Sequence, residues 1–481
     1  MRRSIGIFAA IGLTIVLASG AVAGPLRDAR TSADVFIGET HDPYLLAVRA
    51  YVWGYPLVRA AQLRQNATRA DDPYAKRPPT VAGAPLNTLG HARVPATPET
   101  RIGVAPNSDT LYSLAFLDMD QGPFVLQSPD FGPRYYTFQF GQADTATEQS
   151  LGQRTHGAKL PPVFIHGPGY VGTIPPGMIV APSRYRYLMI AGRILLNGDA
   201  DLPAVHALQD QIRLGRWNGS ASVPATATPQ RPLIGQASGI PKELEFLEML
   251  GSVLRDWTPQ SHDEAITTSF ARIGLTRQHG FQLQDLRPEQ RAAVAEGVAD
   301  GEAIVRAKTY ELGRKVNGWS INYQGPRFGD DHLLRAAVAM DQIYIVEPEE
   351  ALYPSARVDG AGQPLDGRNH YRIRFAPGQF PPVGAFWSIT LYHAKGFMVE
   401  NAINRWAIGD RTPGLRYDRD GSLEIFVQHD RPPGGAAANW LPAPDGPFML
   451  LMRLYHPKQP ILSGAWTPPP VVNVAAKSPV R

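Results

Sequence analysis

The block Asn107-Ser-Asp-Thr-Leu-Tyr112 collects polar side chains at the start of a strand-like run. An amide, a carboxylate and a hydroxyl at a strand entrance can hold the hydroxyl or carbonyl group of a ligand, and Asp109 could act there as a general base. We therefore expect Asn107, Thr110 and Tyr112 to bind a ligand beside a catalytic Asp109. The alternative is a structural network in which Asp109 caps backbone amides at a tight turn.

A second candidate set lies on Arg134-Tyr-Tyr-Thr-Phe-Gln-Phe140, which alternates as a strand does. Tyr136 shares one face with two phenylalanines, and a face of this kind is typical of a core. The polar face beside Arg134 could instead line a pocket. Arg134 and Tyr136 are therefore candidate ligand residues.

The segments 143–148 and 153–157 are expected to form a pair of polar loops. They carry Asp144, Glu148 and His156, the residue types that perform acid–base catalysis or bind a metal ion. Their spacing fixes no geometry, so a catalytic His156 and a metal site both stay open. Because the chain has no Cys, a metal site would use His and carboxylate ligands.

A C-terminal strand pattern gives the last candidates. In Phe386-Trp-Ser-Ile-Thr-Leu-Tyr392, Trp387 takes one face and the polar side chains take the other. His393 follows at the strand end, as a catalytic group or as a structural histidine. Trp387, Arg405 and Trp440 are the candidate ligand residues of this region.

The elements that must position these residues are predicted from periodicity and from turn residues. Apolar residues spaced three and four apart predict helices. Short runs in which apolar and polar residues alternate, bounded by Pro and Gly turn residues, predict strands. Helices are expected at 44–68, 202–214, 242–257, 288–313 and 333–345, and Pro56 should kink or split the first. Strands are expected at 111–117, 124–126, 135–140, 163–165, 178–181, 185–196, 371–375, 385–392, 423–428 and 448–455.

The composition indicates a globular chain with more than one core. It has 481 residues, of which 43% are hydrophobic and 19% charged. The absence of Cys excludes disulfides and thiolate chemistry. We predict an α+β fold with two β-rich, sandwich-like domains and a mainly helical segment between them. The expected division is a signal peptide at 1–23, an N-terminal β-rich domain with a leading helix at 24–200, a mainly helical segment at 201–345 and a C-terminal β-sandwich-like domain at 346–481.

The first residues predict export. Arg2 and Arg3 precede an apolar run from Ile5 to Ala18, and Ala21-Val-Ala23 offers small residues for cleavage. The run is too short to span a bilayer, so we expect a periplasmic or secreted protein without a stable membrane anchor after cleavage. Cleavage after Ala23 would remove Arg2 and Arg3 but no acidic residue, so the formal net charge would fall from +4 to +2. Without a basic run, nucleic acid is not an expected partner.

Common enzyme signatures are missing. Gly167-Pro-Gly-Tyr-Val-Gly172 has the dinucleotide spacing, but the following Thr-Ile-Pro-Pro cannot open the helix that would bind a pyrophosphate. The chain has no His-Glu-x-x-His, Gly-x-Ser-x-Gly or Walker pattern. The sequence identifies no cofactor.

Several ordered blocks resemble a bacterial two-module family built from the domains of unknown function 1254 and 1214. The blocks are Ala50-Tyr-Val-Trp-Gly-Tyr-Pro56, Pro106-Asn-Ser-Asp-Thr-Leu-Tyr112, Arg134-Tyr-Tyr136 and Gly192-Arg193 for the first module, and Phe386-Trp-Ser-Ile-Thr-Leu-Tyr392, Asn404-Arg-Trp-Ala-Ile-Gly409, Asp420-Gly-Ser422, Asn439-Trp-Leu-Pro442 and Arg453-Leu-Tyr-His-Pro457 for the second. The resemblance implies a mixed α and β protein, often exported, and no catalytic mechanism. His393 and Trp406 depart from the family's usual Asp and Tyr, and the loop at 140–150 lacks its aromatic content.

The leading hypothesis is an exported soluble protein with a polar-aromatic pocket. The pocket would bind a small polar or carbohydrate-like ligand and, if the protein is catalytic, hydrolyse it. A His/carboxylate metal enzyme is the second hypothesis. The third is a non-catalytic envelope interaction protein with an extended apolar patch. The sequence leaves open homo-oligomerisation and whether both modules share one site.

Overall fold

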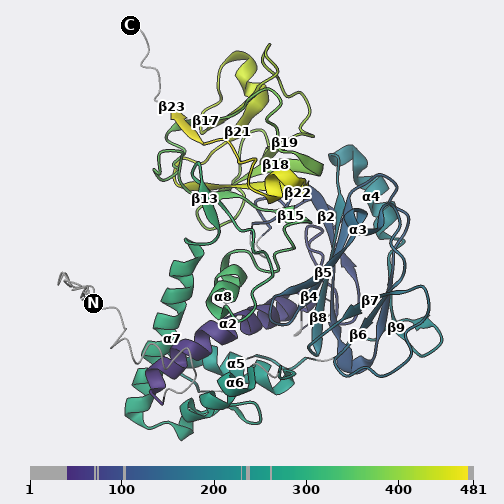
Figure 1. Ribbon diagram of the computed structural model, residues 1–481, viewed down its shortest axis with the longest axis vertical. Coiled ribbons are helices and arrows are strands. Elements are labelled where there is room, and N and C mark those ends of the chain that lie inside the picture. Colours follow the sequence, from purple (N-terminus) through teal and green to yellow (C-terminus); the bar gives the residue numbers. More distant parts are fainter. Residues whose placement is uncertain are drawn as a thin grey trace, which may run out of the picture.

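The computed structural model describes residues 41–69, 72, 75–100, 105–228, 230–233, 239–260 and 263–474. A pair of N-terminal sheets, a group of helices and a pair of C-terminal sheets make up the molecule (Figure 1). The helical segment lies between two β-rich regions, so the predicted α+β fold is confirmed. The predicted signal peptide at 1–23 lies outside the described residues.

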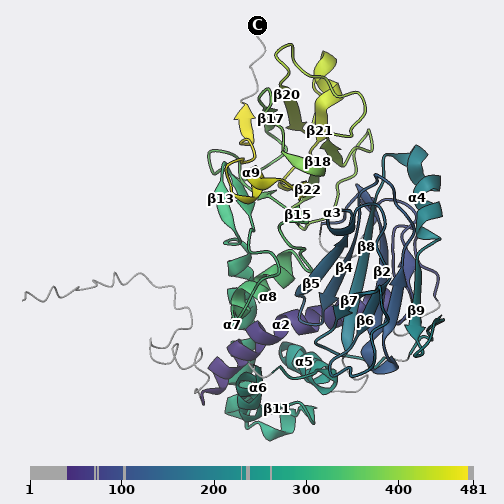
Figure 2. The same ribbon diagram turned by 45° about the vertical axis from the view of Figure 1, so that its right-hand side comes forward.

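The N-terminal domain is a sandwich of two sheets (Figure 2). The first has the order β1-β2-β8-β4-β5, with β1 Gly90–His91, β2 Thr110–Asp118, β8 Tyr187–Leu195, β4 Tyr136–Gln142 and β5 Thr147–Gly152. The second has the order β10-β9-β3-β6-β7, with β10 Ser222–Val223, β9 Arg213–Trp217, β3 Phe124–Gln127, β6 Val163–His166 and β7 Ile179–Pro182. Phe138 and Ile190 of the first sheet share one buried core with Phe124 and Ile165 of the second. The short helices α3 Gln153–His156 and α4 Leu202–Gln209 join strands of this domain.

The central helices are α2 Pro43–Thr68, α5 Glu245–Asp256, α6 Glu264–Ser269, α7 Pro288–Thr309 and α8 His332–Asp341. The small hairpin of β11 Leu275–Thr276 and β12 Gly280–Phe281 lies beside them. Helix α2 begins after Asp42, whose carboxylate accepts a hydrogen bond from the Tyr44 amide at 2.9 Å. The helix is continuous through Pro56 and is not split there. At Gly54 an added Cβ would lie 2.5 Å from Leu250, so α5 packs directly against this turn.

The C-terminal domain is also a sandwich of two sheets. One has the order β13-β14-β16-β22-β18-β19, with β13 Arg314–Val316, β14 Trp319–Ile321, β16 Ser355–Ala356, β22 Phe448–Pro457, β18 Val383–His393 and β19 Ala407–Gly409; β15 Ala351–Leu352 also pairs with β22. The other has the order β21-β20-β17-β23, with β21 Trp440–Pro442, β20 Leu423–Gln428, β17 His370–Phe375 and β23 Val472–Val474. Ile389 and Met452 pack against Ile373 and Ile425 between the sheets. Helix α9, Gln459–Leu462, follows β22.

Three local predictions are wrong. The segments predicted to be polar loops contain the start of β5 and all of α3, because β5 pairs with β4 and the Ser150 hydroxyl donates to Glu347 at 2.6 Å. The helix predicted at 202–214 ends at Gln209, and Arg213 already belongs to β9. The helix predicted to reach 345 ends at Asp341. Gln342 leaves the helical region at φ −137°, and Tyr344 adopts a left-handed φ of 55°. The segment 342–345 then runs beside β4, where Gln139 donates to the Tyr344 carbonyl at 2.7 Å.

Strands beyond the predicted boundaries complete both sandwiches. The strands β9 and β10 follow residue 200 and join an N-terminal sheet, while β13 and β14 precede residue 346 and join a C-terminal sheet. The exact domain boundaries stay a prediction. Among the residues that the structure describes, no helix has both the length and the apolar character needed to cross a membrane.

Candidate functional site

A cavity of ≈ 490 Å³ lies where the N-terminal sheet, the helices and the C-terminal sheet meet. Tyr112 of β2 and Arg193 of β8 form one wall, and Arg453 of β22 belongs to another. Asp341 at the end of α8 and Tyr310 after α7 contribute from the helices. The volume falls within the range of ordinary small-molecule sites.

Arg193 places a positive charge at the buried end of this cavity. Its Nε donates to the Tyr112 hydroxyl at 3.2 Å, and its Nη2 donates to Oε1 of Gln139 at 2.9 Å. The side chain is only 8% exposed, and Nη1 has no hydrogen-bond partner among the described residues. No described carboxylate lies within ion-pair distance of Arg193. Burying a cation without an anion is costly, so this end of the cavity favours a negative charge.

Three tyrosine hydroxyls line the cavity together with Arg193. The Tyr112 hydroxyl accepts from Arg193, and the Tyr455 hydroxyl accepts from Asn107 Nδ2 at 2.9 Å. Neither of these hydroxyls, nor that of Tyr353, donates to any group in the described parts of the chain. The three O–H groups and Nη1 of Arg193 are therefore hydrogen-bond donors without an acceptor.

Arg453 adds a second buried positive charge, but its hydrogen bonds are provided by the protein. Nη1 donates to Thr390 at 2.6 Å, and Nη2 donates to the Tyr392 hydroxyl at 2.7 Å and the Ala105 carbonyl at 2.9 Å. Burial alone would lower the pKa of Arg453, but Tyr392, Tyr455 and Asp109 raise it above its ordinary value. Arg453 thus stays charged and joins the two domains.

Tyr112 differs in its pKa from the other cavity tyrosines. Burial alone would raise its pKa, but the charges of Arg193 and Arg453 and the hydrogen bond from Arg193 outweigh burial and lower it. Burial raises the pKa of Tyr353 and Tyr455. Tyr112 is therefore the phenol of this cluster that gives up its proton at the lowest pH.

Charged and exposed residues form the outer end of the cavity. Arg357 donates to Asp341 at 2.8 Å and lies 6.0 Å from the centre of the Tyr310 ring. Tyr310 is 63% exposed, and the exposed Arg306 and Lys395 also line the cavity. Asp341 is the single acidic residue in the lining drawn from the described residues, and Arg357 neutralises it. Arg306 is paired with Glu302, so Lys395 is the cation of this outer lining that has no ion pair among the described residues.

The predicted block 107–112 contributes both to the cavity lining and to the contact between the two domains. Tyr112 lines the cavity, and Asn107 bridges to Tyr455 and donates to Thr110 at 3.1 Å. Asp109 does not line the cavity: it accepts from Arg411 and from the Ser388 hydroxyl, both at 2.6 Å. Asp109 therefore joins the start of β2 to the C-terminal domain through side-chain partners, and the predicted capping of backbone amides by its carboxylate is not observed among the described residues.

The remaining candidate ligand residues also lie outside the cavity. Arg134 forms an ion pair with Asp201, and Tyr136 stacks on Phe131 with ring centres 3.9 Å apart. Three further candidates belong to the C-terminal domain. Trp387 is part of its core, Arg405 donates to the Trp440 carbonyl at 3.0 Å, and the Trp440 indole donates to the Gln428 carbonyl at 2.9 Å. A ligand role for these residues stays a prediction.

The structure does not bring the candidate catalytic and metal residues together. His156 contacts Thr155 at 2.7 Å on α3, whereas Nδ1 of His393 accepts from the Lys395 amide at 2.9 Å. Asp144 is paired with Arg335, and Glu148 with Arg184. Within the described residues, no group of three or more His, Asp and Glu side chains is arranged to hold a metal ion. A catalytic role for His156 or His393 stays a prediction.

Sequence reasoning did not select Arg193, Tyr353, Arg453 and Tyr455 as site residues. Arg193 and Arg453 carried a detectable signal, because each places a charge within a long, otherwise largely apolar strand run. A buried charge needs a partner or a function. Which of these residues would meet could not be read from the sequence, because they come from different domains.

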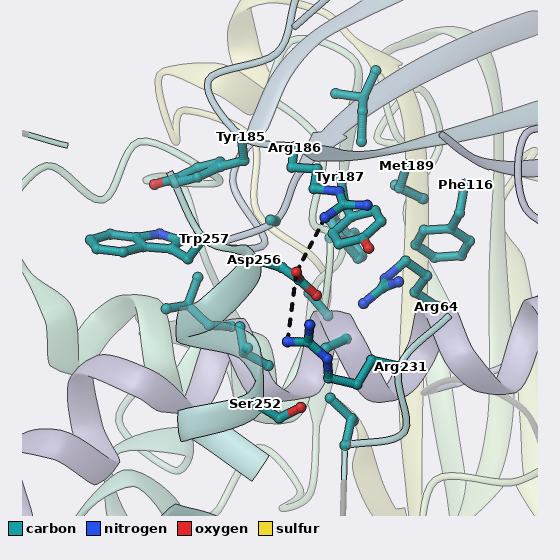
Figure 3. A pocket seen from close by; sticks show the side chains of 18 residues that line it. Arg64, Phe116, Tyr185, Arg186, Tyr187, Met189, Arg231, Ser252, Asp256 and Trp257 are labelled. Carbon is teal, nitrogen blue, oxygen red and sulfur yellow. Dashed lines mark hydrogen bonds and ion pairs between the residues drawn. The ribbon is translucent and has the colours of Figure 1, made fainter. Parts of the chain in front are cut away.

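A second, smaller cavity of ≈ 40 Å³ lies between α2, α5 and β8 (Figure 3). Asp256 lies between Arg186 and Arg231, at 3.2 and 3.9 Å, and Arg64 lies 3.6 Å from the centre of the Tyr187 ring. Such a volume holds a few water molecules and no metabolite, since one water needs about 10–15 Å³. These charges also have partners, so we assign the functional site to the larger cavity.

Two solved structures resemble the fold. The VPA0106 protein from Vibrio parahaemolyticus has a TM-score of 0.65 and 23% identity, over 90% of this chain and 100% of that chain. An uncharacterised protein from Burkholderia cenocepacia has a TM-score of 0.45 and 13% identity, over 92% of this chain and 99% of that chain. A comparison with curated proteins gave no match. The Vibrio structure supports the fold alone.

Two family models match the chain, and both contribute to the cavity. Residues 86–216 match the protein of unknown function DUF1254, and residues 350–459 match the protein of unknown function DUF1214. Tyr112 and Arg193 lie in the first matched region, while Tyr353, Arg453 and Tyr455 lie in the second. The chain therefore belongs to the two-module family in which a DUF1254 region precedes a DUF1214 region.

Proposed function

We propose that this protein binds a small organic anion in the cavity between its two family modules. The observation that carries the proposal is the set of donors without an acceptor: Nη1 of Arg193 and the hydroxyls of Tyr112, Tyr353 and Tyr455. A carboxylate accepts hydrogen bonds without donating any and carries the charge that the buried guanidinium favours. The same ligand group would therefore satisfy the donors and neutralise Arg193.

A neutral carbohydrate fits these groups less well than an anion. Sugar hydroxyls donate as well as accept, and they leave the charge of Arg193 uncompensated. Lys395, at the outer end, also favours the approach of an anion, because a charge without an ion pair in a cleft attracts the opposite charge from solution. We therefore narrow the expected polar ligand to an anion.

The residues of the cavity are better suited to binding than to hydrolysis. The described lining has no histidine, and its one carboxylate, Asp341, is engaged by Arg357. Asp109, the base expected from the sequence, is engaged by Arg411 and Ser388. Tyr112 is the group in the lining that could transfer a proton to or from a bound anion.

Calorimetry with the purified full chain tests the proposal. The panel would contain monocarboxylates, dicarboxylates, sulfonates and inorganic phosphate, with neutral sugars for comparison at constant ionic strength. We expect at least one organic anion class to bind and the sugars not to bind. Arg193→Gln should abolish that binding, whereas Arg368→Gln removes an equal charge from an exposed pair with Asp366 and should leave it unchanged. Binding that survives in Arg193→Gln, or a panel without any bound anion, would overturn the proposal.

Export to the periplasm or the medium is a second part of the proposal. It is supported by Arg2 and Arg3, the apolar run from Ile5 to Ala18 and the small residues Ala21 and Ala23. Fractionation of cells producing the full chain, with N-terminal sequencing of the product, tests it. A chain that stays in the cytoplasm and keeps residues 1–23 would contradict export.

A further inference from the structure

The face of β22 that lines the cavity changes from polar to apolar along its length. Met449, Leu451, Arg453 and Tyr455 all line the cavity, and their spacing of two residues puts them on one face of the strand. With about 3.4 Å per residue, this row spans roughly 20 Å. The cavity therefore offers an elongated path with Tyr455 at one end and Met449 at the other.

The Tyr455 end is closed, whereas Met449, itself 6% exposed, lies beside residues at the protein surface. Tyr455 is 1% exposed, and it lies near Arg193, which is also buried. At the other end Nη1 of Arg357 contacts the sulfur of Met449 at 3.4 Å, and Arg357 neighbours the exposed Tyr310. A ligand entering past Tyr310 would therefore reach the donor cluster last.

Apolar side chains from the end of α8 and the segment that follows it also line the cavity, alongside the polar Asp341 and Gln342. Met340 at the end of α8, and Ile343 and Ile345 in the segment that follows it, line the cavity. This wall exists because the helix stops at Asp341 and the chain turns at Tyr344. An apolar stretch between two polar ends matches a ligand that has an apolar body.

We infer that the ligand is an elongated amphipathic carboxylate, such as a medium-chain fatty acid. Its carboxylate would lie at Arg193 and the tyrosine hydroxyls, and its apolar chain would run past Leu451 and Met449 toward the mouth. The inference rests on the proposed function, since it names the class of organic anion. Inorganic phosphate would leave the apolar walls unused, and a short dicarboxylate would place its second charge beside Leu451 and Ile343.

Calorimetry with straight-chain acids from acetate to decanoate tests the inference, at concentrations below micelle formation. We expect the affinity to rise about fourfold for each methylene buried beyond butanoate. Octanamide, which has the same chain without the charge, should bind at least tenfold more weakly than octanoate.

Two variants of the apolar wall sharpen the test. Met340→Gln and Ile343→Asn add polarity at partly buried positions, and urea denaturation of each variant checks that it stays folded. Each should weaken octanoate binding about five- to tenfold and leave acetate binding within twofold. Val472→Asn changes an exposed apolar side chain on β23, outside this cavity, and should change neither.

The outcomes separate this inference from the proposed function. If carboxylates bind in an Arg193-dependent way but their affinity does not rise with chain length, the amphipathic ligand is wrong and anion binding stands. If octanamide binds as tightly as octanoate, or no acid binds, the proposed anion site itself fails. A chain-length dependence that persists in both wall variants would also overturn the assigned path.

Discussion

The side-chain amide of Asn107 donates a hydrogen bond to the Tyr455 hydroxyl at 2.9 Å, and so links the DUF1254 region to the DUF1214 region at the cavity. Asn107 is 6% exposed, and its oxygen accepts from the Asp109 amide at 2.7 Å. One amide therefore fixes the local turn, positions Tyr455 and leaves the proton of that hydroxyl free for a ligand.

Asn107→Asp should weaken anion binding more than it weakens the fold. The substitution keeps the acceptor for the Asp109 amide, but it removes the donor to Tyr455 and adds a negative charge beside the donor cluster. We expect octanoate affinity to fall roughly tenfold or more from charge repulsion. Calorimetry checks this. Asn218→Asp makes the same change in an exposed turn and should leave affinity within twofold; unchanged binding in Asn107→Asp would contradict the assigned ligand position.

Asp109→Asn should destabilise the protein, because this carboxylate holds two domains together. It accepts from Arg411 and Ser388 at 2.6 Å each, and its side chain is 9% exposed. Breaking such a pair leaves Arg411 partly unpaired, which we expect to cost about 3 kcal/mol in the free energy of unfolding. Urea denaturation of the single variants and of Asp109→Asn with Arg411→Gln measures the coupling. Additive single effects would show that the pair does not join the domains.

Local pattern predicted the strands well and the cavity poorly. The strand at 423–428 was predicted with its exact bounds, because alternation and turn residues are local signals. Helix α8 ends early at Asp341, and the left-handed Tyr344 that follows packs against β4, an arrangement that propensity does not reveal. Asn107 and Tyr112 could be predicted as a polar block. Their partner Tyr455 is 348 residues from Asn107, and no local pattern pairs the two.

Tyr112 should ionise at a lower pH than the other tyrosines of the cavity. Arg193 and Arg453 lower its pKa against the effect of burial. Absorbance of tyrosinate at alkaline pH should show an early transition that Tyr112→Phe removes and Tyr353→Phe retains. Because the folded-state pKa is lowered, wild type should gain stability over Tyr112→Phe as the pH rises from that pKa to the unfolded value. Bound octanoate should move the transition to higher pH, and an unchanged transition would contradict contact between the anion and Tyr112.

Asp410→Asn should stabilise the protein at neutral pH. Burial raises the pKa of Asp410 to about 6, and Arg411 offsets that effect only in part. A raised carboxyl pKa favours the protonated form in the folded state, so wild type loses stability as the pH rises through 6. Asp410 keeps some solvent contact, so we expect a gain of only about 1 kcal/mol at pH 8 and little at pH 4. Denaturation at both pH values checks this, and an equal effect at both would contradict the raised pKa.

Substitution of the buried Arg193 should affect ligand binding, whereas substitution of the buried Arg453 should affect the stability of the fold. Arg453 makes protein hydrogen bonds to Thr390, Tyr392 and Ala105, whereas both N–H groups on Nη1 of Arg193 lack a partner among the described residues. We expect Arg453→Gln to lower the free energy of unfolding by about 3 kcal/mol, because it leaves buried acceptors unsatisfied. Arg193→Gln should change it by less than about 1 kcal/mol, since removing an uncompensated buried charge offsets the lost contacts. Urea denaturation and octanoate calorimetry of both variants provide the comparison. If Arg193→Gln destabilises the fold as much as Arg453→Gln does, the guanidinium of Arg193 serves the structure and its assignment to a ligand fails.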